Sequence, residues 1–132
     1  MTPDEKFEQN VLFEVVETSI PLWEVAAEAS VLGDQLDSAA KVAKARELIR
    51  RLRERGWVDL FETEYLGDET PAPPKQRVEP ARVDAVLESS SVWDYERVAN
   101  SRKRYVLYRT DRGAREFKEQ LERERRQRGS SG

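Results

Sequence analysis

Apolar residues recur at helical spacing in three successive stretches of the first 56 residues. The first stretch follows Thr2-Pro3-Asp4-Glu5, an order that predicts a capping box with proline at the first helical position. Its apolar face consists of Phe7, Val11, Leu12, Val15 and Val16. Ser19-Ile20-Pro21 then interrupts the pattern, because proline cannot continue the hydrogen-bond ladder.

Two further helices are expected before Gly56. A short one follows Pro21, ends at Gly33-Asp34, and has an apolar face of Leu22, Val25, Ala26 and Ala29. Asp37 or Ser38 can cap the third helix, which runs to about Arg55 and stops at Gly56. Its buried stripe is Val42, Ala45, Leu48, Ile49 and Leu52.

The pattern changes period after Gly56 and predicts two strands, at 57–65 and 104–109, because both stretches are rich in aromatic and branched residues. Four of the six prolines fall within 67–80, which indicates a loop. Pro80 is expected to open a short helix that reaches Leu87 and ends at Ser89, and no element is assigned to 92–95. Thr110 caps a last helix with one apolar face, made of Ala114, Phe117 and Leu121.

The predicted fold class is therefore α+β. A three-helix core precedes a two-stranded antiparallel wing, an insertion separates the two strands, and a C-terminal helix follows. Residues 1–128 are expected to form one domain, with the insertion at 66–103, and residues 129–132 to form a flexible tail. This is a winged-helix-like arrangement.

Two stretches carry a resemblance to a known family. Residues 39–58 are similar to the passage from helix to strand, Leu-x-x-x-Gly-Trp-Val here, of winged-helix regulators, and residues 105–113 resemble the close of the wing in PadR- and MarR-like proteins. The chain also resembles small actinobacterial proteins whose second helix opens with Pro-Leu-Trp, which implies no activity. The winged-helix resemblance implies DNA binding by the third helix and a role in transcription regulation. The insertion departs from the short hairpin of a plain wing.

The composition excludes several kinds of chemistry. The chain has no cysteine and no histidine, so it has no disulfide, no zinc site of the usual kind, no thiol nucleophile and no imidazole base. No phosphate-binding glycine motif is present, and the acids Glu14, Glu17, Glu24 and Glu28 occupy ordinary helix-surface positions. We therefore expect no enzyme activity and no cofactor. The acidic start and the lack of a long apolar run predict a cytoplasmic protein.

Charge is unevenly distributed along the chain, although the net charge is only −3. Residues 1–40 carry net −8 and residues 56–96 carry net −7, whereas residues 41–55 carry net +5 and residues 97–132 carry net +7. The surface potential depends on local charge, so the two basic blocks can attract a polyanion despite the acidic total.

The first basic block coincides with the third predicted helix. Its candidate DNA-binding residues are Lys44, Arg46, Arg50, Arg51 and Arg53. Arg46, Arg50 and Arg53 form a stripe that could hold phosphate or guanine. The most exposed line of the helix also contains Glu47 and Glu54. A solvated helix surface with ion pairs four residues apart is an equally good interpretation.

The second cluster of candidate DNA-binding residues, Arg102, Lys103 and Arg104, precedes the second strand, where a wing tip is expected, and Arg97 and Arg109 are near in sequence. Wing residues commonly contact the nucleic-acid backbone or minor groove. The alternative is a charged loop that keeps a strand edge soluble.

The three tryptophans have different expected roles. Trp57, between a helix and a strand, is predicted to be a core residue. Trp23 is expected in the core or in a dimer contact, and Trp93 is expected to hold the insertion against the body.

Three functional hypotheses follow. The first is a DNA-binding winged helix that forms a homodimer. The second is a protein-interaction module that has kept the fold and lost DNA binding, which the acids on the third helix and the insertion motivate. An enzyme with carboxylate chemistry is a distant third. One continuous positive face favours DNA, and basic patches split by the insertion favour protein partners.

Overall fold

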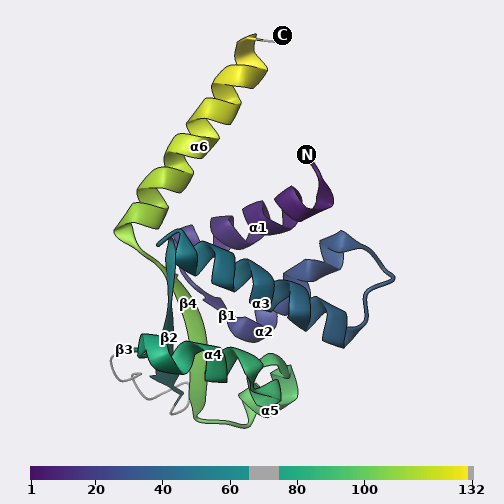
Figure 1. Cartoon of the computed structure of the whole chain (residues 1–132), viewed down its shortest axis with the longest axis vertical. Coiled ribbons are helices and arrows are strands. Elements are labelled where there is room, and N and C mark those ends of the chain that lie inside the picture. Colours follow the sequence, from purple (N-terminus) through teal and green to yellow (C-terminus); the bar gives the residue numbers. More distant parts are fainter. Residues whose placement is uncertain (66–74, 131–132) are drawn as a thin grey trace.

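The computed structural model describes residues 1–65 and 75–130, and these residues contain six α-helices, two 3-10 helices and one four-stranded antiparallel sheet (Figure 1). The α+β class is confirmed, but the expected two-stranded sheet has four strands, in the order β1-β4-β2-β3. The elements in chain order are α1 (Pro3–Glu17), β1 (Ile20–Pro21), α2 (Leu22–Glu28), η1 (Ala29–Leu32), α3 (Ser38–Glu54), β2 (Val58–Glu64), β3 (Gln76–Arg77), α4 (Pro80–Glu88), η2 (Ser90–Trp93), α5 (Tyr95–Ala99), β4 (Lys103–Arg109) and α6 (Asp111–Ser130).

The N-terminal helix begins as predicted. The backbone N–H of Glu5 donates to Thr2 Oγ1 at 3.1 Å, and the Glu5 carboxylate accepts from the Thr2 N–H at 3.4 Å. This capping box satisfies two backbone donors that the start of a helix otherwise leaves without partners. The buried face of α1 is Phe7, Val11, Leu12 and Val15.

Helix α3 also starts and stops at the expected residues. Asp37 is its N-cap, with its carboxylate accepting from the Ala40 N–H at 2.8 Å. Gly56 follows its end with φ +76°, a left-handed conformation that favours glycine. The buried face consists of Ala45, Leu48, Ile49 and Leu52, and it packs in the core with α2 and the sheet.

The central strands β2 and β4 pair along their whole length, from Val58 opposite Arg109 to Glu64 opposite Lys103. The prediction that Ser19-Ile20-Pro21 is only an interruption was incomplete. Ile20 and Pro21 form β1, which pairs with β4, and Ile20 is fully buried. A two-residue strand has no periodicity of its own, so the proline there indicated only the end of a helix.

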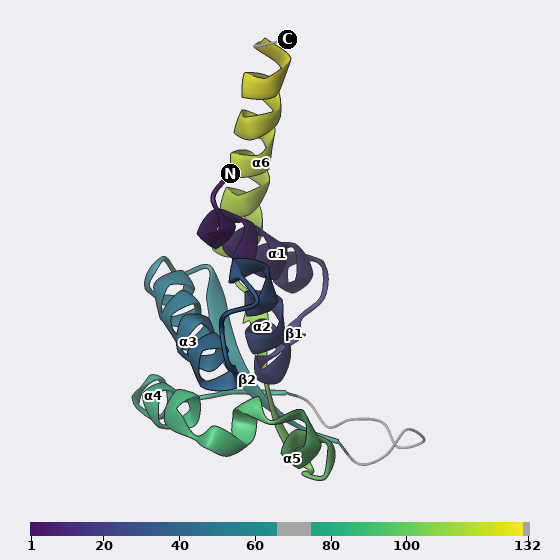
Figure 2. The ribbon, with the colours of Figure 1, turned by 90° about the vertical axis from the view of Figure 1, so that its right-hand side faces the viewer.

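The segment between β2 and β4 forms a small layer at one end of the sheet, as Figure 2 shows for α4 and α5. Helix α4 matches the prediction, whereas β3, η2 and α5 were not predicted. Most of the expected proline-rich loop, at 67–74, lies outside the described residues. Trp93 is buried, and its indole N–H donates to the Leu87 carbonyl oxygen at 2.9 Å. This hydrogen bond lies within the insertion. The contact with the body is made by the Arg46 guanidinium of α3, which lies over the Trp93 ring at 5.8 Å from its centroid.

The other two tryptophans also have identifiable packing roles. Trp57 is 8% exposed and belongs to the core, as predicted. Trp23 is half-buried, and its ring packs edge-on against Tyr95 at a centroid distance of 4.8 Å. Trp23 thus links α2 to α5.

The last helix begins at a predicted cap. The Gly113 N–H donates to Thr110 Oγ1 at 2.9 Å. Helix α6 then runs to Ser130, so residues 129 and 130, assigned to a flexible tail from the sequence, are helical, and residues 131 and 132 lie outside the described part. The helix projects from the body at the end opposite α4 and α5 (Figures 1 and 2). Across the described ranges, no helix combines the length and apolar character that spanning a membrane requires.

We expect Gly113→Ala to lower the stability of the fold by about 1–3 kcal/mol, the usual cost of overpacking. A Cβ atom at this position lies 2.1 Å from the carbonyl oxygen of Trp57, and backbone cannot move aside as a flexible side chain can. Chemical denaturation measures the free energy of unfolding. Gly129→Ala is the matched control in the same helix, where an added Cβ meets no atom within 4 Å. Equal stability of both variants contradicts the close approach.

Candidate functional site

The five candidate residues on α3 lie on a helix that is flanked by α1 on one side and by α4 on the other, as Figure 1 shows. Both neighbours carry carboxylates, from Asp4 and Glu8 on α1 and from Asp84 and Glu88 on α4. The sequence placed the basic side chains on this helix correctly. It did not indicate that acids from distant parts of the chain surround them.

Two arginines of α3 bind α4. Arg50 donates to the carboxylate of Glu88 at 2.8 Å and to that of Asp84 at 3.4 Å. Arg46 donates from Nε to the carbonyl oxygen of Leu87 at 2.6 Å, and its Nη1 lies 3.8 Å from Glu88. The Leu87 carbonyl belongs to the last turn of α4, where backbone oxygens lack partners within the helix. The guanidinium groups therefore join α3 to the end of α4.

The electrostatics of this contact follow from its geometry. The hydrogen bond to Glu88 is the main cause that raises the pKa of Arg50 above its ordinary value. The same hydrogen bond lowers the pKa of Glu88, and the charge of Arg46 lowers it further. Glu88 therefore stays ionised to a lower pH than an isolated glutamate does.

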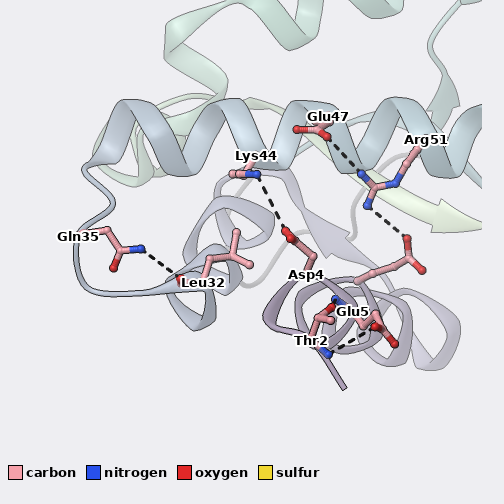
Figure 3. Close-up of polar contacts among 9 residues, drawn as sticks. Thr2, Asp4, Glu5, Leu32, Gln35, Lys44, Glu47 and Arg51 are labelled. Atoms are coloured by element: carbon pink, nitrogen blue, oxygen red, sulfur yellow. Dashed lines mark hydrogen bonds and ion pairs between the residues drawn. The ribbon is translucent and has the colours of Figure 1, made fainter.

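On the α1 side, Arg51 lies between two glutamates. Its guanidinium is 3.3 Å from Glu8 of α1 and 3.5 Å from Glu47 of α3 (Figure 3). Arg55 also pairs with Glu8, at 3.3 Å. Lys44 reaches Asp4 at 4.0 Å, and both of these side chains are largely exposed, so this pair contributes little to stability.

The outward surface of α3 is an open groove of about 460 Å³. Three arginines line it, Arg46, Arg50 and Arg51, and so do three glutamates, Glu47, Glu54 and Glu88. The charges balance, which gives a polyanion little net attraction to this surface. Arg53 lies outside the groove lining and forms no ion pair with any described residue, and its Nε is buried with no hydrogen-bond partner.

The second candidate cluster lies at the start of β4. Lys103 pairs with Glu62 of β2 at 3.2 Å, and the Arg104 guanidinium lies over the Tyr65 ring, 4.2 Å from its centroid. Arg102 is exposed and precedes the strand. Helix α4 contacts α3 through Asp84, and its other face lines a cavity together with Lys103 and Arg104. It therefore separates the basic residues of α3 from those at the start of β4.

The sequence reasoning missed Asp84 and Glu88, the acids that bind the α3 arginines. Their spacing of four residues on a correctly predicted helix placed them on one face, which was a usable signal. No local pattern connected that face to α3. Contact between residues about 40 positions apart depends on how the insertion folds back.

The acids of the first two helices, considered from the sequence as possible carboxylate pairs, interact electrostatically around Glu24. The pKa of Glu24 is raised above its ordinary value, and burial is the main cause, followed by the charges of Glu14 and Glu28. Within the described ranges no three aspartate or glutamate side chains are grouped closely enough to hold a metal ion.

We expect Glu88→Gln to lower the unfolding midpoint by a small amount at neutral pH and to leave it unchanged in acid. The lowered pKa of Glu88 means that its ion pairs stabilise the fold above the ordinary carboxyl range and are lost as the pH falls through the lowered value. Thermal unfolding at a series of pH values measures the difference. Glu119→Gln, on the exposed face of α6, is the control. If the unfolding midpoints of Glu88→Gln and the wild type still differ in acid, the stabilisation does not come from the ion pairs of Glu88.

Comparisons with known proteins add no family to this description. No protein-family model matches the chain, no curated protein matches its sequence, and no solved structure matches its fold. The function has to be argued from the arrangement of its own residues.

Proposed function

We propose that this chain is a winged-helix domain that acts by binding protein, and that its first partner is a second copy of itself. Three helices followed by an antiparallel pair of strands, β2 and β4, support the winged-helix assignment. The two strands flank an insertion, and a C-terminal helix follows them. The proposal for protein binding rests mainly on one observation, the way α6 leaves the body.

Helix α6 packs against the body along one face, which begins at Gly113 beside the Trp57 backbone. Phe117 is buried, and Leu121 is partly buried against the core. Further along, the Gln9 side chain of α1 donates to Glu124 at 3.4 Å. Beyond this point the helix projects from the body (Figure 2). A helix of 20 residues is about 30 Å long, so α6 offers a long surface to a partner.

An exposed aromatic side chain lies at the base of this projection. Phe13 of α1 is 45% exposed, and its ring packs edge-on against Phe117 at a centroid distance of 5.3 Å. A large aromatic residue with a half-exposed ring is a typical anchor of a protein interface. Leu121, one turn after Phe117 on α6, is also only partly buried.

The charges of the two helices suit an interface between copies. Helix α1 carries five acids and one base, and α6 carries seven bases and five acids. In a two-fold symmetric dimer the same surface of each copy meets the other. The acidic α1 of one copy can then face the basic α6 of its partner. Complementary charge of this kind favours the correct pairing of the two helices.

The dimer is tested by sedimentation equilibrium over a range of concentrations. We expect the wild type to dimerise and Phe13→Ser to raise the dimer dissociation constant by about tenfold or more, because it removes a central aromatic anchor. Tyr95→Ser is the matched control, since Tyr95 is 59% exposed on α5, at the opposite end of the molecule. If the wild type stays monomeric at the highest reachable concentration, the proposed dimer is contradicted.

DNA binding is the second candidate function, and one observation favours it. The carboxylates that hold Arg50 are themselves exposed, with side-chain exposures of 81% for Asp84 and 57% for Glu88. DNA phosphates could replace exposed carboxylates on the α3 arginines. Arg102 provides a further exposed cation. In this case the protein acts as a regulator of transcription whose DNA-binding helix is partly neutralised by α4.

This candidate is tested with the double variant Asp84→Asn/Glu88→Gln and a short labelled DNA duplex. We expect the variant to bind at least about tenfold more tightly than the wild type at low salt, and to lose affinity steeply as salt is added. The control Asp34→Asn/Glu17→Gln removes the same two charges from exposed positions away from α4. If neither protein binds the duplex even at low salt, or if the control gains as much affinity, DNA binding by α3 is excluded.

A further inference from the structure

A cavity of about 350 Å³ lies between the insertion and the sheet. It is bounded by α4, η2, α5 and the start of β4, and Trp23 of α2 also lines it. The volume falls in the range of pockets that bind small molecules, roughly 300–1,000 Å³. It is separate from the α3 groove, because the two sites share no lining residue.

The charged residues around this cavity are all cations. Arg82, Arg97, Lys103 and Arg104 line it, and no carboxylate does. Two acids behind the lining pair with three of these cations. Glu62 lies 3.9 Å from Arg82 and 3.2 Å from Lys103, and Asp94 lies 3.9 Å from Arg97. Four cations and two acids leave a positive potential, and low-dielectric walls concentrate such a potential inside a cavity.

Arg104 is the cation that has no carboxylate partner among the described residues. Its guanidinium stacks over Tyr65, and its Nε is buried without any hydrogen-bond partner. Arg104 nevertheless lines the cavity, and no carboxylate in the described part of the chain neutralises it. Its charge is therefore available to an anionic ligand in this cavity.

The remaining walls are suited to an apolar body. Trp23, Val86, Val92 and Val98 provide aromatic and aliphatic surface. Hydroxyl groups are available from Tyr105 and from the serines of the α4–η2 turn. A lining that combines cations with apolar walls matches a molecule that has both characters. A metal ion does not fit, because the lining has no carboxylate ligands.

We propose that this cavity binds a small organic anion that has an apolar body, with Arg104 as its main charge partner and Trp23 in contact with the apolar part. A bare inorganic anion leaves most of the apolar wall without a partner. A cation is repelled by the lining. This assignment is independent of the dimer surface and of the α3 groove, which lie elsewhere on the molecule.

The probe is anilinonaphthalene sulfonate, an organic anion whose fluorescence rises in apolar surroundings, and its uncharged counterpart is N-phenylnaphthylamine, which has the same ring system without the sulfonate. Fluorescence titration of the full chain measures a dissociation constant for each probe. We expect the anion to bind at least tenfold more tightly than the neutral probe. Equal affinity for the two probes overturns the proposal, because it removes the role of the cations.

Three variants locate the site. Arg104→Met removes the guanidinium and keeps an apolar stem, and we expect it to weaken binding of the anion by about tenfold or more, as loss of a charge-assisted contact does. Arg102→Met removes the same charge two residues away, outside the lining, and is expected to change the affinity by less than twofold. Equal weakening by the two variants overturns the site.

The third variant tests the same cavity in case Arg104→Met does not fold. Ala85 lines the cavity from an exposed position on α4, so Ala85→Phe fills space without removing a charge or a core contact. We expect this variant to keep the wild-type unfolding midpoint and to weaken binding of both probes. Unchanged binding of the anion by a folded Ala85→Phe variant places the anion elsewhere and overturns the proposal.

Discussion

Two turns lie in contact at one end of the sheet, next to the first residue pair of β2 and β4. The turn after α3 and the turn before α6 are joined because the Thr110 N–H donates to the Trp57 carbonyl at 2.9 Å and the Thr110 hydroxyl donates to the Gly56 carbonyl at 2.6 Å. Gly113 must lack a side chain for this approach. The contact fixes the register of β2 against β4 at the end where Val58 pairs with Arg109. The open end can therefore carry a long insertion, since the entropy cost of a loop rises only slowly with its length.

The insertion places α4 between the α3 groove and the cavity beside β4. Asp84 and Glu88 lie on the face that binds α3, whereas Arg82, Ala85 and Val86 lie on the face that lines the cavity. This division follows from helical spacing, because residues three and four apart share a face. The proposed anion site and the α3 arginines thus contact different faces of one short helix.

Local signals in the sequence were sufficient where a structure is determined by neighbouring residues. The Thr2 capping box, the Asp37 cap, Gly56 and the Thr110 cap each act within four residues, and each is found at its predicted place. The strands β1 and β3 escaped prediction because each has two residues and is defined only by its partner strand. The candidate site residues were chosen by their charge, and the acids that neutralise them were not predicted, since pairs such as Arg50 and Glu88 depend on tertiary packing.

The uneven charge of the sequence is best understood through these tertiary pairs. The basic block at 41–55 is largely neutralised inside the molecule, because Lys44, Arg46, Arg50, Arg51 and Arg55 all pair with acids of α1, α3 or α4. These ion pairs hold α3 between its neighbours. The basic residues of this helix therefore stabilise the fold, and their charge is largely neutralised before any ligand binds. The block at 97–132 is different: Arg102 and Arg104 have no ion pair within the described part of the chain, and α6 carries its arginines away from the body. An excess of positive over negative charge is thus found around the cavity and on α6, where we place the ligand and the partner.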